Sequence, residues 1–226
     1  MGTSQGSYRQ RLPDEKRSLL LLGATGLTGQ QLLAQAIEQG HDITALVRNP
    51  SKLRVEHSGL RTVTGDATDP GVVDDALEGR DAVLCALGTR SPKSLVSCDL
   101  MTASMHALVP SMKRRGVNRV VVESALGVGP SASHAPPALR LAFATVLRQV
   151  GKDKAAAEEY LRASDLDWTI VYPPSLTNGP ATRDYHRGEA LQLKGVPKIS
   201  RADVAHFMLS QLNDATYSRG MAIVSS

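Results

Sequence analysis

The sequence has few aromatic residues, only two cysteines and no long apolar run. Its 226 residues include one Trp, five Tyr and two Phe, so a flat ligand would find few rings to stack on. Cys85 and Cys98 lack the spacing of a metal site, which predicts free thiols in a reducing compartment and no bound metal. No apolar stretch approaches the roughly 18 residues typical of a membrane-spanning helix, so we expect a cytoplasmic protein without a membrane partner.

Strong charge of either sign is also missing. The formal net charge is +4, and half of it comes from residues 1–17. Lys and Arg never run beyond residues 113–115, so no nucleic-acid partner is expected. Residues 1–17 are polar and lack the apolar core of a signal peptide, which predicts a disordered tail. No heptads or apolar stripe indicate an interface, and we expect a monomer.

From Ser18 onward, short apolar runs alternate with amphipathic helical patterns. Strands are expected at 19–22, 42–48, 60–64, 82–87, 119–123, 168–172, near 190–193 and at 221–224. Helices are expected at 27–39, 69–77, 94–115, 138–164 with a break near Gly151, and 202–212. This alternation predicts βαβ units and a parallel sheet, hence one doubly wound, Rossmann-like α/β domain over residues 18–226. In such folds, ligands bind at the carboxyl ends of the strands.

A glycine-rich turn, GATGLTG at 23–29, joins the first strand to the first helix. Its glycines allow a tight turn, and the helix N-terminus offers backbone N–H donors to a pyrophosphate. A plain tight turn is the alternative interpretation. No Lys-Ser/Thr pair follows the glycines, which disfavours a Walker-type nucleotide site. The residues expected to contact the cofactor here are Gly23, Thr25, Gly26, Leu27, Thr28 and Gly29.

The spacing G-x-x-G-x-x-G resembles that of extended and atypical short-chain dehydrogenases/reductases. Further motifs carry the resemblance along the chain: LVRNP at 46–50, GD at 65–66, ALGT at 86–89, WTIVYPP at 168–174 and SRADVAHFM at 200–208. Together they cover nearly all of residues 18–226. They resemble the NAD(P)H-binding, NmrA-like branch, and most of all its flavin reductase/biliverdin-IXβ reductase group.

Arg48 indicates which nicotinamide cofactor is bound. An NAD enzyme places Asp or Glu at the end of the second strand, whereas Arg48 can grip a 2′-phosphate through charge-assisted bonds of about 1.5–3 kcal/mol. That energy gives about a tenfold to hundredfold preference for NADP(H). An exposed loop arginine is the alternative. The resemblance also implies that Arg48 contacts the 2′-phosphate, that Asp66 lies beside the adenine and that Gly88 lies by the ribose on the nicotinamide side. The remaining expected cofactor contacts are Asn49, Ala67, Leu87, Tyr172 and Pro173.

The expected active site lacks the Tyr-x-x-x-Lys pair of conventional short-chain dehydrogenases. Lys154 lies where the family lysine would, but Val150 precedes it by four residues. Lys154 is a candidate for holding ribose hydroxyls, and a solvated helix lysine is the alternative. Ser124 follows the fifth strand, where the family has its active-site serine, and a turn serine is its alternative. Ser175 replaces the histidine that the flavin reductase group often carries after the prolines.

These features predict an NADPH-dependent reductase that transfers hydride to a small, flat conjugated acceptor such as a flavin or bilin, with solvent supplying the proton. Such acceptors delocalise the added charge, so positioning carries most of the rate. A non-catalytic NADP(H)-sensing regulator or assembly factor of NmrA-like type is the alternative. A sugar-nucleotide or quinone oxidoreductase is a third hypothesis. No separate substrate domain remains in the chain, so the acceptor is expected under the loops at 88–92, 124–137 and 173–190.

Overall fold

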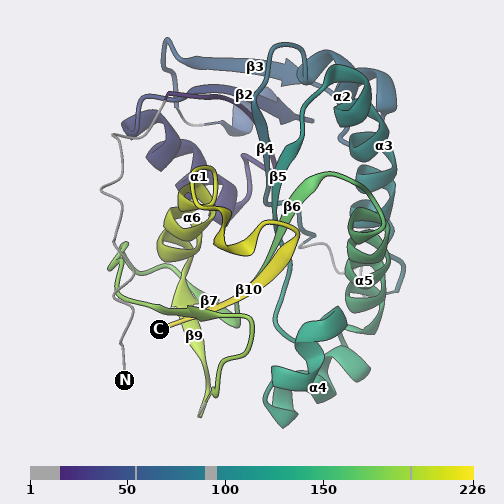
Figure 1. Cartoon of the computed structure of the whole chain (residues 1–226), viewed down its shortest axis with the longest axis vertical. Helices are drawn as coiled ribbons and strands as arrows, with labels where there is room; N and C mark the ends of the chain where they lie inside the picture. Colours follow the sequence, from purple (N-terminus) through teal and green to yellow (C-terminus); the bar gives the residue numbers. More distant parts are fainter. Residues whose placement is uncertain (1–15, 54, 90–95, 194) are drawn as a thin grey trace, which may run out of the picture.

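A central sheet of eight strands runs through the molecule (Figure 1). It is seen in a computed structural model that describes residues 16–53, 55–89, 96–193 and 195–226. The strand order is β3-β2-β1-β4-β5-β6-β10-β8, and every neighbouring pair is parallel except β10–β8. The strands are β1 (Ser18–Leu22), β2 (Asp42–Val47), β3 (Leu60–Thr64), β4 (Ala82–Cys85), β5 (Arg119–Glu123), β6 (Asp167–Tyr172), β8 (His186–Gly188) and β10 (Gly220–Ser225). The predicted doubly wound α/β fold is confirmed.

Helices cover both faces of this sheet. Helices α1 (Leu27–Glu38) and α6 (Arg201–Ser210) lie on one face in Figure 1. The opposite face carries α2 (Pro70–Ala76), α3 (Leu100–Arg115) and α5 (Arg148–Arg162). The short helix α4 (Pro137–Ala144) packs on α5 near one end of the sheet.

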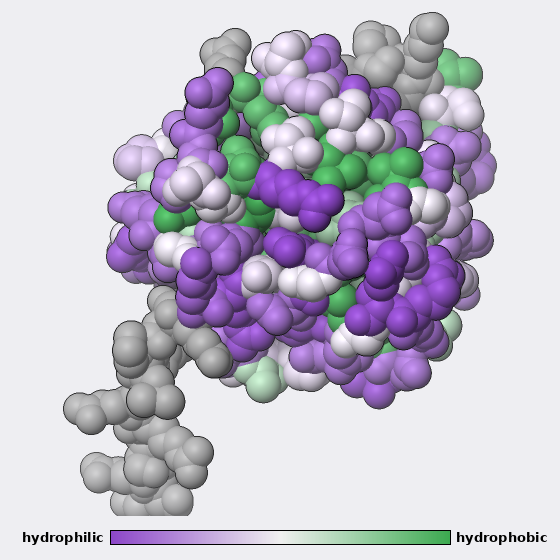
Figure 2. Space-filling model, turned by 90° about the horizontal axis from the view of Figure 1, so that it is seen from above, coloured by the Kyte–Doolittle hydropathy of each residue, from purple (hydrophilic) through white to green (hydrophobic). Residues whose placement is uncertain are grey.

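The leucines of β1 explain why its sequence is apolar without alternation. Leu20 and Leu22 are buried in the core under α2, α3 and α5, whereas Leu19 and Leu21 are buried in the core under α1 and α6. Successive side chains of a strand point to opposite faces, so a strand covered on both sides needs apolar residues at every position. On the outside, the view in Figure 2 is mostly hydrophilic, with hydrophobic residues in smaller groups.

The long helix expected at 138–164 is two helices, and the break lies at residues 145–147 rather than at Gly151. Gly151 is inside α5, where an added Cβ would lie 2.9 Å from the Phe143 ring of α4. This glycine therefore makes room for α4 and does not end a helix. The helix expected from residue 94 begins at Leu100; residues 94 and 95 lie outside the described part.

The C-terminal third differs most from expectation. The strand expected near 190–193 is absent there, and β8, which lies earlier in the chain, instead pairs antiparallel with β10. A separate two-stranded parallel sheet of β7 (Ser175–Thr177) and β9 (Lys198–Ser200) was not expected. Three-residue strands are too short to show a period of two, which is why the sequence pattern misses them.

The first described residues, Lys16 and Arg17, contact the rest of the domain. Lys16 Nζ lies 3.0 Å from Asp42 Oδ2, and the Arg17 N–H donates to His41 Nδ1 at 3.1 Å. Residues 1–15 of the expected tail lie outside the described residues, so their disorder stays a prediction. Within the described ranges, no helix is long and apolar enough to cross a membrane, and no three His, Cys, Asp or Glu side chains gather as metal ligands would.

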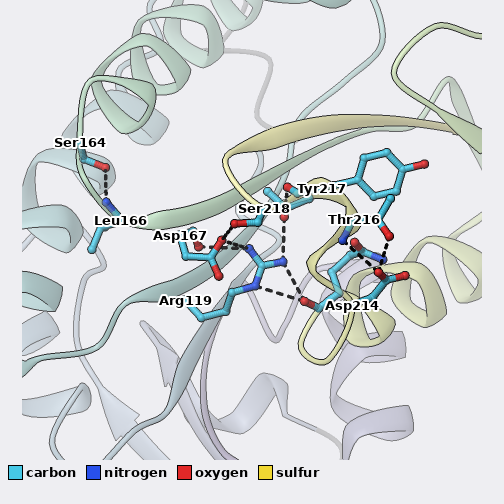
Figure 3. A network of polar contacts seen from close by, with 10 residues as sticks. Arg119, Ser164, Leu166, Asp167, Asp214, Thr216, Tyr217 and Ser218 are labelled. Atoms are coloured by element: carbon cyan, nitrogen blue, oxygen red, sulfur yellow. Dashed lines mark hydrogen bonds and ion pairs between the residues drawn. The ribbon is translucent and has the colours of Figure 1, made fainter. Parts of the chain in front are cut away.

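A buried arginine links β5 to the last part of the chain (Figure 3). Arg119 donates to the carbonyl of Gln211 at 2.8 Å, to Asp167 Oδ1 at 3.2 Å and to Thr169 Oγ1 at 2.7 Å. Thr169 Oγ1 donates in turn to the carbonyl of Tyr217, 2.8 Å away. The network therefore ties β5 and β6 to the end of α6 and to the turn before β10.

Candidate functional site

The turn after β1 lies directly against the end of β4, at the point where the strand order reverses. Gly23 has φ +87°, and a Cβ on it would lie 2.4 Å from the carbonyl oxygen of Ala86. The Gly26 N–H closes the turn on the Gly23 carbonyl at 2.9 Å. Gly26 is also the N-cap of α1 and has no side chain to occupy the first N–H groups of that helix. Those donors are the kind that bind a phosphate.

Gly29 holds α1 close to this turn. A Cβ at Gly29 would lie 2.0 Å from the Gly23 carbonyl oxygen, nearer than any packing allows. The neighbouring Thr28 is buried, and its Oγ1 donates to Glu123 Oε1 at 3.1 Å. The turn therefore contacts both β4 and the end of β5.

One side of the turn opens into a hollow of about 290 Å³, here called the Arg48 hollow. Arg48 is exposed at its edge, and Asp66 accepts from the Thr68 N–H at 3.0 Å. The predicted cofactor-contact residues that line it are Gly23, Thr25, Gly26, Arg48, Asp66, Ala67, Leu87 and Gly88. Asn49 is not among the lining residues; its Oδ1 accepts from the Ser51 N–H at 3.0 Å and caps a local turn.

On the other side lies a hollow of about 300 Å³, here called the Ser124 hollow. It includes both predicted catalytic residues, Ser124 and Lys154, together with Leu27 and Thr28 of the turn. The two hollows share Gly26, Ala86, Leu87 and Gly88. They therefore form one crevice across the carboxyl ends of β1, β4 and β5, where ligands of this fold class bind.

Ser124 and Lys154 come from different elements and meet at this hollow. Ser124 follows β5, is 6% exposed and shares a short hydrogen bond with Glu158 Oε1. Lys154, on α5, donates from Nζ to the carbonyl of Glu123 at 3.4 Å. The lysine is thus held beside the end of β5, and it lines the hollow.

Two buried glutamates were not predicted as site residues. Glu123 lines the Ser124 hollow, and Glu158 lies behind Ser124; they are 7% and 3% exposed. Burial raises the pKa of Glu123, against the opposing effects of Lys154 and Thr28. Burial likewise raises the pKa of Glu158, against the hydrogen bonds from Ser124 and Tyr172 and the charge of Arg162. Two buried carboxyl groups with raised pKa values therefore flank Ser124.

The structure places Tyr172, a predicted cofactor contact, in the core. Its ring is fully buried, and its hydroxyl donates to Glu158 Oε2 at 2.6 Å. Burial and the neighbouring Glu158 raise the pKa of this phenol. Pro173 is buried too, and its carbonyl accepts from the Leu126 N–H at 2.9 Å. Neither residue lines the two hollows. The Tyr172 side chain therefore supports Glu158 in the core and does not face the crevice.

Comparisons with known proteins show the family of the chain. The sequence profile of a family described as NAD(P)H-binding matches residues 23–215. A photosystem II assembly factor from Synechocystis is 29% identical over 154 residues, which are 68% of this chain and 43% of that protein. An oxidoreductase from Aspergillus parasiticus is 26% identical over 89% of this chain and 80% of that protein. The chain thus spans less than half the length of the Synechocystis relative.

A solved structure of similar fold is that of ChuY, an anaerobilin reductase from Escherichia coli. It superposes with a TM-score of 0.76 over 92% of this chain and 96% of that one, at 24% identity. The likeness supports the fold. The family profile extends from the glycine-rich turn at residues 23–29, here called the phosphate turn, to beyond α6. The chain therefore belongs to the NAD(P)H-binding family.

Proposed function

We propose that the protein is an NADPH-dependent reductase that passes a hydride to a flat conjugated acceptor of flavin or bilin type. The observation that carries the proposal is the single crevice that runs from Arg48 past the phosphate turn to Ser124 and Lys154. A bound dinucleotide would supply the hydride. The chain supplies binding, orientation and the groups around the acceptor.

The phosphate turn fits a dinucleotide. A Cβ at Gly23 would collide with the backbone after β4, and the uncapped start of α1 offers N–H donors at the same place. The turn would hold the pyrophosphate, and Arg48 with the nearby Lys52 would hold a 2′-phosphate. Ser124 and Lys154 would then face the nicotinamide half in the other hollow.

The lining of the Ser124 hollow favours an acceptor that needs little help from side chains. Its described lining residues include no aromatic ring, so a flat acceptor would stack mainly on the nicotinamide. A conjugated acceptor stabilises the incoming charge by delocalisation, and correct positioning then supplies most of the rate. The fold likeness to a protein named as an anaerobilin reductase supports an acceptor of this class.

A second candidate function is a regulator or assembly factor that binds NADP(H) without turnover. The similarity to a photosystem II assembly factor favours it. The two candidates differ in one measurable property: a sensor binds the dinucleotide tightly, yet no acceptor speeds its oxidation.

Replacing Arg48 with Ala tests the cofactor assignment. We expect NADPH to bind about tenfold to hundredfold more weakly and NADH to bind unchanged, because the guanidinium would hold the 2′-phosphate, which NADH lacks. Fluorescence titration of both dinucleotides measures this. Arg61→Ala, at an exposed position of β3, is the matched control and should bind NADPH like the parent. Equal NADPH affinity in Arg48→Ala and the parent would contradict the assignment.

A panel of acceptors tests the reaction. We expect FMN, riboflavin or a bilin to accelerate NADPH oxidation, and Ser124→Ala to lower kcat by about 10- to 100-fold through loss of its hydroxyl at the hollow. Ser133→Ala, in the exposed part of the following loop, should leave kcat unchanged. No acceleration by any flavin, quinone or bilin would rule out the reductase and favour the regulator.

A further inference from the structure

Glu158 is buried, and both of its carboxyl oxygens have hydrogen-bond partners. Ser124 faces its Oε1, while Oε2 accepts from Tyr172 at 2.6 Å and from Arg162 at 3.2 Å. Gly129, at φ +51°, brings the loop backbone so close that a Cβ there would lie 2.5 Å from Oε2. Among these hydrogen-bond partners of the carboxyl group, Ser124 is the one that also lines the Ser124 hollow.

The two carboxyl oxygens have different surroundings. Oε2 already accepts two hydrogen bonds: the Arg162 guanidinium can only donate, and the Tyr172 hydroxyl, which can donate or accept, donates to Oε2 here. Oε1 faces a serine hydroxyl, which can donate or accept. A proton on Glu158 is therefore stable on Oε1 and would clash with donors on Oε2. When Oε1 carries it, the carboxyl donates to Ser124, and the hydroxyl hydrogen of Ser124 is free to point into the hollow.

From this arrangement we infer that Glu158 holds a proton on Oε1 and delivers it, through the Ser124 hydroxyl, to the acceptor bound in the Ser124 hollow. The inference rests on the proposed function and replaces solvent as the immediate proton source. Glu158 is a positioning residue in this scheme, because only Ser124 contacts the acceptor.

The hydride and the proton reach the acceptor from different sources. The acceptor gains two electrons and one hydrogen as hydride from the bound dinucleotide, which is oxidised. The anion formed on the acceptor takes the Ser124 Oγ proton, and Ser124 takes the proton from Glu158 Oε1. The carboxylate left on Glu158 is held by Tyr172 and Arg162 until water returns a proton.

A small cavity beside Ser124 and Glu158 is suited to a water molecule that returns the proton to Glu158. It has a volume of about 10 Å³ and is lined by Ser124, Lys154 and Glu158 together with apolar side chains of α3 and α5. This is close to the lower limit for one water molecule. Lys154 lines both this cavity and the Ser124 hollow, so the two spaces adjoin.

Burial favours the protonated form that the inference needs. The groups facing Glu158 are Ser124, Tyr172 of β6, and Lys154 and Arg162 of α5; each lowers its pKa, and burial raises it by more. With a folded pKa above the unfolded one, the carboxyl contributes stability below its unfolded pKa. That stability is lost as pH rises through the folded pKa. In Glu158→Gln this loss should be absent, so unfolding midpoints measured against pH should decline less than in the parent.

Infrared spectra of the cofactor-free protein test the proton directly. We expect a protonated-carboxyl band at mildly acidic pH that Glu158→Gln removes and Ser124→Ala shifts, because the band reports the hydrogen bond at Oε1. In Tyr172→Phe the band should persist to higher pH, since the phenol stabilises the carboxylate. Absence of a band assignable to Glu158, or a band that Ser124→Ala leaves unmoved, would overturn the inference.

Turnover of the same variants tests delivery. In Glu158→Gln the new side-chain carbonyl can still accept from Tyr172 and Arg162 and the new amide can donate to Ser124, so this variant should fold. We expect its kcat to fall about 100-fold with KM for NADPH within about twofold, and its pH dependence to flatten. Ser124→Ala should add no further loss in the double variant. Glu159→Gln, at the exposed neighbouring position, is the control.

Failure of the two proposals can be told apart. If the parent reduces no acceptor, the proposed function is wrong, and the infrared spectra still decide whether Glu158 holds its proton against Ser124. If the parent reduces an acceptor and Glu158→Gln does so at the same rate with the same pH profile, the proton delivery is wrong and the reductase stands.

Discussion

Gly29→Ala should destabilise the protein by about 3 kcal/mol and lower its thermal midpoint by about 9 °C. Helix propensity alone predicts the opposite sign, because Ala in a helix is favoured over Gly by about 1 kcal/mol. Backbone overlap decides the outcome: the new Cβ would lie 2.0 Å from the Gly23 carbonyl oxygen and 3.0 Å from the Cα of Ala24. Helix α1 must therefore move away from β1.

The same movement displaces the N–H groups at the start of α1 from the phosphate turn. We therefore expect NADPH affinity to fall at least about tenfold in the fraction that remains folded. Thermal unfolding of the free protein and NADPH titration measure the two effects. Gly88→Ala is the matched control for stability, since nothing lies within 4 Å of an added Cβ and its φ is not in the left-handed region. A midpoint for Gly29→Ala equal to that of Gly88→Ala would show that the overlap relaxes at little cost.

Much of the fold could be predicted because its signals are local. The strands β3 and β5 have the predicted bounds, and α2 begins after Asp69, whose side chain accepts from the Gly71 N–H at 2.8 Å. Each of these elements depends on residues next to it in the sequence. The tight turn at residues 23–29 was predictable for the same reason, since its glycine spacing lies between an apolar strand and an amphipathic helix.

The buried glutamates could not be predicted in the same way. Glu158 lies in the segment KAAAEEYLR, where a charged residue normally indicates a solvated helix face. Its burial is decided by two other segments: the loop after β5, which supplies Ser124 and Gly129, and β6, which supplies Tyr172. One signal was present for Glu123: it follows three valines and ends a parallel strand, at the edge of the sheet where ligands bind in this fold class.

The direction of the Tyr172 side chain could not be predicted for the same reason. The motif put it at the end of β6, and that position is correct. The direction of its ring depends on which residues of β6 face α5. The motif does not encode this choice. Alternation within β6 sends Tyr172 to the α5 face, with Ile170 and Trp168, and sends Val171 to the opposite core.

Arg119→Met should cost about 3 kcal/mol and lower the thermal midpoint by about 9 °C. The side chain of Arg119 is 10% exposed, and its guanidinium donates to the Gln211 carbonyl, Asp167 and Thr169 (Figure 3). Methionine fills a similar volume without donors. The Gln211 carbonyl and the Thr169 hydroxyl would then lose a partner in a place that water reaches poorly, which is the costly case for a hydrogen bond.

The position of Arg119 predicts that Arg119→Met leaves NADPH binding unchanged, in contrast to its effect on stability. Arg119 is the first residue of β5, whereas Ser124 follows its last, so the network and the crevice lie at opposite ends of the strand. Folded Arg119→Met should therefore bind NADPH with the parent's affinity at low temperature, unlike Gly29→Ala. Arg140→Met, an exposed site on α4, is the matched control and should change stability by less than about 0.5 kcal/mol. If Arg119→Met unfolds at the same temperature as Arg140→Met, the buried donors are replaced by water, and the network does not hold the C-terminal strand in place.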